Sequence, residues 1–304
     1  MTLNQLRTFV AVVDCGSVRM AAEQLVVSQP AVSGAVSSLA RELGVDLVER
    51  DGRGLRVTPA GSAFAAAARS CLHHLDHGVR LARSVEEPGR GAVRIAAIAT
   101  AAERLLLPIL AGFREEYPEA EVTVQVGNRS DVWDALRDYD VDLVVAGRPP
   151  SSAQVEVLGQ ASNTLVVVGL PTERRSRADT MRHLATSTWL LREDGSGTRS
   201  ATDELLDHLR LDPPRMVLGS NGAVEAAVLA GFGVGLLPLG AVRRRLTSGA
   251  LARVDCPGTP MDRPWHLVAS TVVDLSPTAA LAARSLLEAT GGFTPAAAGR
   301  RLLR

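Results

Sequence analysis

The sequence contains no lysine, so every basic side chain other than histidine is an arginine. A guanidinium donates two parallel hydrogen bonds, which suits phosphate and carboxylate partners. The formal net charge is zero, so overall charge does not indicate a nucleic-acid partner, and only a local basic patch could serve one. Aromatic residues make up only 3% of the chain, so its cores must be built from Ala, Val and Leu.

Cysteines are also scarce. Cys15, Cys71 and Cys256 are odd in number and widely separated, which argues against a disulfide framework or a Cys-x-x-Cys site. This usage fits a reducing cytoplasm. The first residues lack a signal-peptide pattern, and no apolar run reaches the ~18 residues of a membrane span. We therefore expect a cytoplasmic protein without membrane association.

Catalytic and metal-binding patterns are missing as well. The chain has no G-x-S-x-G and no H-E-x-x-H motif. His73 and His77 have a spacing that two metal ligands could share on a helix, but a solvated or interfacial pair is the favoured interpretation. We expect no cofactor and no enzymatic activity. A length of 304 residues predicts about two domains.

The stretch Val18–Leu43 predicts two helices joined by a tight turn, which is the pattern of a helix-turn-helix. Ser28 is placed to cap the second helix, and Pro30 fits its first turn. Gly44 stands where a helix-ending glycine is expected. The apolar face of this second helix consists of Val32, Val36, Leu39 and Leu43.

The opposite face of that helix carries Gln29, Ser33 and Ser37. These side chains are short, uncharged and able to hydrogen-bond, so they could touch base edges in a major groove. An ordinary solvated face would show the same residues, and the face alone does not decide between the two interpretations.

A hairpin is predicted next, with strands at residues 47–50 and 55–57 around the turn Asp51–Gly54. Arg53 lies between two glycines at the tip, where a guanidinium could enter a narrow minor groove. A solvated arginine is the alternative, and the neighbouring helix-turn-helix favours DNA contact.

A long helix is predicted from Pro59 to about Val85. Its apolar residues repeat with the alternating steps of four and three that are typical of a coiled-coil seam. Such a seam needs a partner, and the same helix of a second chain would present two reading helices to two half-sites. The seam residues are Ala68, Leu72, Leu75, Val79 and Ala82.

The charged and Pro/Gly-containing segment at residues 86–91 marks a domain boundary. Strands and helices alternate beyond it, which predicts an α/β domain with mainly parallel strands. Its ~200 residues and the break at Pro149–Pro150 suggest two lobes with a cleft between them. The segment from Gly291 to Arg304 is expected to be loose.

Ligands of open α/β sheets bind beyond the carboxyl ends of the strands. The loop at residues 192–199 is the most informative such position, because glycines, hydroxyls and a helix start converge there on a plausible anion site. Helix capping alone is the alternative. The residues predicted to bind a ligand are Thr100, Ala101, Asn128, Ser130, Arg148, Ser196, Gly197 and Thr198.

The first 61 residues resemble the winged helix-turn-helix of LysR-type transcriptional regulators. The motifs are S-Q-P-A-V-S at Ser28–Ser33, the L-x-x-E-L-G that ends at Gly44, and V-T-P-A-G at Val57–Gly61. Further likeness to the family's effector domain lies in F-R-x-x-Y-P at Phe113–Pro118 and V-D-L-V-V at Val141–Val145. The resemblance thus covers nearly the whole chain.

This resemblance implies a cytoplasmic homodimer or homotetramer that binds double-stranded promoter DNA and answers to a small-molecule effector, with RNA polymerase as a candidate partner. The run around residues 193–199 resembles a branch whose members bind small anionic metabolites. The expected parts are a winged helix-turn-helix domain at residues 1–61, a linker helix at 62–87, a two-lobed, periplasmic-binding-protein-like effector domain at 88–290 and a flexible tail at 291–304.

In this interpretation Gln29, Pro30 and Ser33 meet base edges, and Arg53 enters the minor groove. Phosphate contacts come from Ser28, Ser38 or Arg50. Gly34 stands where many relatives have a long polar side chain, which puts the operator preference in doubt. A solute-binding module, or an enzyme with an accessory N-terminal domain, is the alternative, and retention on duplex DNA would discriminate between them.

Overall fold

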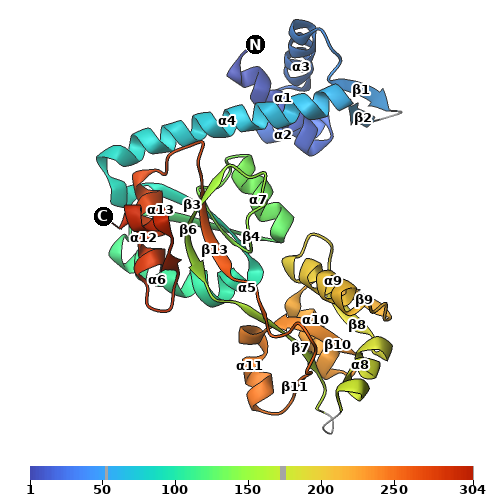
Figure 1. Ribbon diagram of the computed structural model, residues 1–304. Coiled ribbons are helices and arrows are strands. Elements are labelled where there is room, and N and C mark those ends of the chain that lie inside the picture. The colour runs from blue at the N-terminus through green and yellow to red at the C-terminus, as the bar shows by residue number, and fades with distance from the viewer. Residues whose placement is uncertain (52–53, 172–175, 304) are drawn as a thin grey trace. The chain divides into compact units, whose positions relative to one another are not determined.

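The fold is described from a computed structural model that covers residues 1–51, 54–171 and 176–303 (Figure 1). The chain divides into two compact units. One comprises Met1–Arg83 with the short segment Asp138–Asp140, and the other comprises Ser84–Arg137 and Val141–Arg304. In the described part of the chain, no helix is both long and apolar enough to cross a membrane.

The first unit begins with three helices whose ends carry the caps that the sequence predicts. The hydroxyls of Ser17 and Ser28 accept backbone N–H bonds at the starts of the second and third helices. Gly44 ends the third helix at a φ of 70°, a conformation that glycine adopts without strain. The helices are α1 (Leu3–Cys15), α2 (Val18–Leu25) and α3 (Gln29–Leu43).

A hairpin and a long helix complete this unit. Strands β1 (Val48–Asp51) and β2 (Gly54–Val57) pair antiparallel; the first is shifted by one residue toward the turn relative to the prediction, and the second is one residue longer at the turn. Helix α4 runs over Pro59–Glu86. Phe9, Val12, Val32, Leu39 and Leu47 are fully buried in the core that these elements share.

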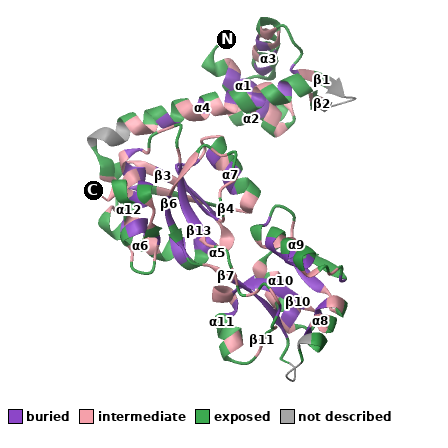
Figure 2. Cartoon of the chain, viewed as in Figure 1, coloured by how far each residue is buried: buried purple, intermediate pink, exposed green. Residues whose placement is uncertain are grey.

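The seam predicted along α4 is only partly available to a second chain. Ala68 and Leu72 are buried in the core of the first unit beside α1, so they do not serve an intermolecular contact. Leu75 and Val79 are 41% and 43% exposed, and Ala82 is exposed. Figure 2 shows exposed and intermediate residues along α4. The prediction of a continuous intermolecular seam is therefore wrong in its first half, because those positions already have partners within the chain.

The second unit contains two lobes, each built on a six-stranded mixed sheet. In the first lobe, β3 lies parallel to β4 and β5, whereas β13 runs antiparallel to β5 and β6. The strand order is β14-β6-β13-β5-β3-β4. The strands are β3 (Ala92–Ile98), β4 (Glu121–Gly127), β5 (Leu143–Ala146), β6 (Val155–Ala161), β13 (Trp265–Ser270) and β14 (Thr294–Pro295).

Helices cover both faces of this sheet. Helices α6 (Leu107–Glu116) and α12 (Pro277–Glu288) pack on one face, and α7 (Arg129–Arg137) packs on the other. A 3-10 turn, η1 (Pro88–Arg90), precedes β3. Two short elements precede α6, because α5 (Ala99–Ala101) and the π-helical turn η2 (Ala102–Leu106) continue directly into it.

The second lobe has the strand order β11-β7-β10-β8-β9, with β12 beside β7. Strand β8 is parallel to β9 and β10, and β7 is antiparallel to β10. The strands are β7 (Thr164–Gly169), β8 (Trp189–Arg192), β9 (Arg215–Leu218), β10 (Val234–Pro238), β11 (Ala252–Arg253) and β12 (Met261–Asp262). The helices are α8 (Arg177–Thr186), α9 (Gly197–Leu209), α10 (Asn221–Leu229) and α11 (Leu239–Thr247).

The two sheets are mixed, so the expectation of mainly parallel strands is wrong. The antiparallel pairs arise where the chain crosses between the lobes. It leaves the first lobe after Ala161 and returns after Asp262, not at Pro149–Pro150, which lies between β5 and β6. Asn163 and Arg263 tie the two crossings together, since Arg263 N donates to the Asn163 carbonyl (2.8 Å) and Asn163 Nδ2 donates to the Arg263 carbonyl (2.9 Å).

The C-terminal segment is ordered, contrary to the expectation of a loose tail. Strand β14 pairs with β6, and α13 (Ala297–Leu302) follows it. Phe293 is 2% exposed within the first-lobe core, and Gly299 lies so close to the Leu158 carbonyl that a Cβ would be 2.0 Å from its oxygen. Small residues in this segment therefore mark close packing.

Candidate nucleic-acid interface and inter-lobe cleft

Helix α3 presents the predicted polar face to solvent. Gln29, Pro30, Ser33 and Ser37 are all exposed, while Val32, Val36 and Leu39 anchor the opposite face in the core. Ser28 is also exposed, and its hydroxyl accepts from Ala31 N–H (3.4 Å). This is the geometry of a helix that can enter a groove while its own domain holds it rigidly.

The remaining predicted contacts lie on the hairpin. Arg50 belongs to β1, where it pairs with Leu55, and Arg53 lies outside the described residues. On α3 itself, Gly34 is exposed, and a Cβ at this position would meet nothing within 4 Å. The middle of the exposed face is therefore unusually flat.

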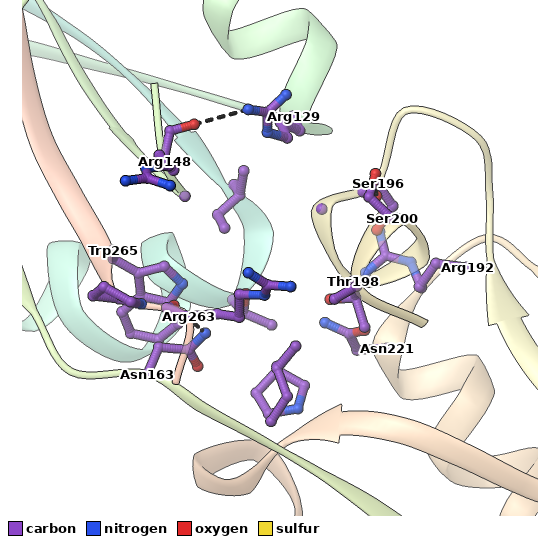
Figure 3. A pocket seen from close by; sticks show the side chains of 18 of the residues that line it. Arg129, Arg148, Asn163, Arg192, Ser196, Thr198, Ser200, Asn221, Arg263 and Trp265 are labelled. Carbon is purple, nitrogen blue, oxygen red and sulfur yellow. Dashed lines mark hydrogen bonds between the residues drawn. The ribbon is translucent and has the colours of Figure 1, made fainter. Parts of the chain in front are cut away.

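A cavity of about 790 Å³ lies between the two lobes of the second unit (Figure 3). Arg148 and Trp265 stand on the first-lobe side, Ser196, Thr198 and Asn221 stand on the second-lobe side, and Arg263 extends between them. The volume is that of a cleft for a small molecule.

The structure brings most of the predicted ligand-binding residues to this cavity. Those that line it are Thr100, Asn128, Arg148, Ser196, Gly197 and Thr198. Thr100 belongs to the first turn of a helix and not to a loop. Ala101 points away, because it is fully buried in the first-lobe core. Ser130 is not among the lining residues, and its hydroxyl lies beside Gly195 of the second lobe.

The second-lobe wall is built around the first turn of α9. Ser196 occupies the N-cap position and is 4% exposed, yet its side chain makes no capping hydrogen bond. The interpretation of Ser196 as a capping residue alone is therefore wrong. Asn221 at the start of α10 also lines the cavity, and its Oδ1 is buried without a hydrogen-bond partner in the described chain. Both side chains offer polar atoms to a ligand.

The cavity is electropositive. Its charged lining comprises four arginines (Arg129, Arg148, Arg192, Arg263) and two carboxylates (Glu204, Asp262), so four positive and two negative charges leave a formal excess of two. Excess positive charge in a cleft with low-dielectric walls favours anionic ligands.

Most of these arginines are already engaged. Arg192 binds Glu193 through two bonds of 2.7 Å, which lower the pKa of that carboxyl despite its partial burial. Arg263 pairs with Glu204, and Arg129 donates to the Arg148 carbonyl (2.8 Å). Among the described residues, the Arg148 guanidinium has no hydrogen bond or ion pair. It is thus the group best placed to hold an anion.

Several lining residues were missed in the sequence. Asn163 and Arg263 come from the two lobe crossings, and Trp265 and His266 begin β13 just after the second crossing. The crossings are not predicted from the sequence, because the strands beside them, β6 and β12, are not predicted. Asn221 could have been found, because Ser220 precedes it as a good N-cap after a strand.

Both units match known protein families. Residues 3–62 match the family described as "Bacterial regulatory helix-turn-helix protein, lysR family", and residues 86–291 match the "LysR substrate binding domain". The HTH-type transcriptional regulator CfxR of Cupriavidus necator is 33% identical over 297 residues, which cover 96% of this chain and 93% of the relative.

Two solved structures are similar. Full-length CbnR complexed with its target DNA has a TM-score of 0.66 at 23% identity, covering 94% of this chain and 98% of that chain. The regulatory domain of CcmR from Synechocystis PCC6803, in complex with 2-PG, has a TM-score of 0.55 at 25% identity, covering 61% of this chain and 90% of that chain.

Proposed function

The chain belongs to the LysR family of transcriptional regulators, and from this premise we propose that it binds promoter DNA under the control of a small anionic effector in its inter-lobe cleft. It is a DNA-binding regulator and not an enzyme. The observation that carries the effector proposal is the Arg148 guanidinium, which lines an electropositive cavity opposite hydroxyl groups and the N-terminus of α9.

For the DNA contacts, we assign base edges to Gln29, Pro30 and Ser33, with Ser37 further along the same face. Their shared exposure on α3 supports this assignment. Phosphate contacts from Ser28 and Arg50 would fix the register of the helix, and Arg53 would enter the minor groove.

For assembly, we propose a homodimer or homotetramer in the cytoplasm. The exposed apolar side chains of Leu75 and Val79 on α4 support a contact with a second copy. Two copies would present two α3 helices to two half-sites, and RNA polymerase is then a further partner at the promoter.

For the effector, Arg148 would pair with the anionic group while Ser196, Thr198 and Asn128 donate hydrogen bonds. The excess positive charge of the lining supports an anion, and CcmR offers a precedent in its complex with 2-PG. Thr100 and Gly197 would bring backbone groups to the same space.

The test replaces Thr198 with Val, which keeps the side-chain shape and removes the hydroxyl. A ligand that binds only the folded state raises the melting temperature, so a panel of phosphorylated and carboxylate metabolites, 2-PG included, first identifies a stabilising anion. Thr198→Val should lose that stabilisation and keep wild-type DNA affinity, whereas Thr198→Ser, which restores a hydroxyl, should retain both. A normal anion response in Thr198→Val would remove this loop from the effector site.

A further inference from the structure

His266 lies on β13 directly after Trp265, and its imidazole lines the first-lobe side of the cleft. The residue is 7% exposed, and its Nδ1 is buried without a hydrogen-bond partner in the part of the chain that the structure describes. A buried polar atom without a partner costs about 1–3 kcal/mol, so one that borders a ligand cavity points to a role in the bound complex.

The neighbouring strands bring no negative charge to this imidazole. In the sheet His266 stands opposite Ala146 of β5 and Gln160 of β6, neither of which is charged. The segment after β5 carries Arg148, which also lines the cavity. The positive charge of Arg148 therefore acts on His266 from the segment that follows β5.

Other charged groups near this end of the lobe are occupied. Helix α7 packs against β13 and carries Arg129 and Asp131 in its first turn, where the Asp131 carboxylate accepts from Asn128 N–H (2.9 Å). On the strand leading into β13, Asp262 accepts from the Thr164 hydroxyl (3.0 Å), and Arg263 pairs with Glu204. Each of these carboxylates already has a partner of its own.

These surroundings disfavour the protonated form of the imidazole. Burial lowers the pKa of His266 below its usual value, the positive charge of Arg148 lowers it further, and the carbonyls of Pro264 and Ala146 act in the opposite direction. A bound anion would offset the second of these causes, because negative charge beside the ring favours its protonated form.

We propose that His266 couples effector binding to proton uptake: an anion held by Arg148 places negative charge beside the imidazole, the imidazole takes up one proton, and the protein binds the anion more tightly as the pH falls. This inference rests on the proposed effector site and adds its regulation by pH. Affinity should rise as the pH falls through the pKa of His266 in the complex, and level off below its pKa in the free protein.

The probe is sodium sulfate, which stays a dianion across the relevant pH range and so contributes no proton of its own. Its stabilisation of the full-length protein is titrated by thermal shift at about pH 6 and about pH 8, with sodium chloride at matched ionic strength as reference. We therefore expect sulfate to bind more tightly at the lower pH, by at most about tenfold for each unit by which the anion raises the His266 pKa.

Three variants separate the contribution of His266 from those of another histidine and of Arg148. His266→Gln should make sulfate affinity independent of pH, with DNA binding as the check on folding. His208→Gln replaces an exposed histidine on α9 and should leave the pH dependence unchanged. Arg148→Gln should weaken sulfate binding at both pH values, because it removes the proposed anchor.

A measurement on the wild-type protein tests the same proposal without depending on whether a variant folds. An NMR titration of the histidine ring protons should show the His266 pKa below its usual value in chloride and raised in sulfate. If sulfate stabilises the protein equally at both pH values and leaves the pKa of His266 unchanged, the proposed proton coupling is wrong, while the proposed anion site in the cleft is retained. If sulfate binds at neither pH, both the proposed anion site and the proposed proton coupling are wrong.

Discussion

At the scale of single residues, Gly34 shapes the exposed face of α3, which is the face proposed to read DNA. Around it, Ala31, Ser33 and Ser37 are exposed and short, so the middle of α3 offers no long side chain to a base. In the proposed placement of α3, Gln29 at the start of the helix would supply much of the hydrogen bonding to base edges, with the hairpin as the second contact.

Gly34→Arg should change both stability and sequence preference. Gly in a helix interior costs about 0.5–1 kcal/mol, so arginine should raise the free energy of unfolding by a similar amount, measured by denaturant titration. A guanidinium at this place should add a preference for guanine of about 1–3 kcal/mol, measured by selection from a random duplex pool.

The matched control is Gly112→Arg on α6, another exposed helical glycine with open space around it. It should gain stability in the same way and leave the selected DNA sequence unchanged. Identical selected sequences from Gly34→Arg and the wild-type protein would contradict the placement of α3 in the groove.

Residue-scale reasoning from the sequence succeeded where local chemistry decides the outcome. Ser28 and Gly44 cap α3 as predicted, since a cap depends only on its own turn. The prediction for Ala101 is wrong. Its position after the carboxyl end of a strand predicts a ligand contact, but the residue is buried in the core. His266 gave no local signal, because its environment is created by strands distant in the sequence.

At the scale of elements, the C-terminal segment is part of the first lobe. Phe293 lies in the core that includes Leu158, Leu286 and Leu287. Phe293→Ala should therefore lower the free energy of unfolding by about 3–5 kcal/mol, measured by denaturant titration. Thr294→Ala, at an exposed neighbour, should change it by less than about 0.5 kcal/mol. Equal stability of the two variants would contradict this packing.

Helix α4 offers the test of assembly. Leu75→Asp combined with Val79→Asp places two charges on its exposed apolar positions and should convert the oligomer to a smaller species in light scattering. Circular dichroism should stay unchanged, because neither side chain is buried in the chain's own core. Ala67→Asp, at another exposed position of the helix, is the control. An unchanged mass for the double variant would remove these residues from the interface.

Elements with strong periodicity were predicted well, and short ones were not. Helices α3 and α4 match their predicted bounds closely because their apolar spacing agrees with the signals at their ends. Strand β6 was missed because Gly159 and Gln160 interrupt its apolar pattern, although Gly159 is needed where Phe293 and Leu287 approach the backbone. The tail was judged loose from its Gly and Ala content, which in fact permits close packing.

At the scale of the whole molecule, the two-lobed unit carries the control of DNA binding. The lobes are joined by two crossings tied through Asn163 and Arg263, and Arg129 N–H donates across the cleft to the Gly195 carbonyl (3.2 Å). The proposed anion between them would contact both lobes, so it would favour one lobe arrangement over another and thereby act on DNA affinity.

The most direct test of this account is thermodynamic linkage between the two sites. The affinity of the full-length protein for a duplex selected from a random pool is measured with and without the saturating anion found in the metabolite panel. Anion affinity is then measured with and without that duplex. The account predicts a change in DNA affinity of about 5–150-fold and a reciprocal change of equal size in anion affinity. An anion that binds in the cleft and leaves both the affinity and the footprint on DNA unchanged would contradict it.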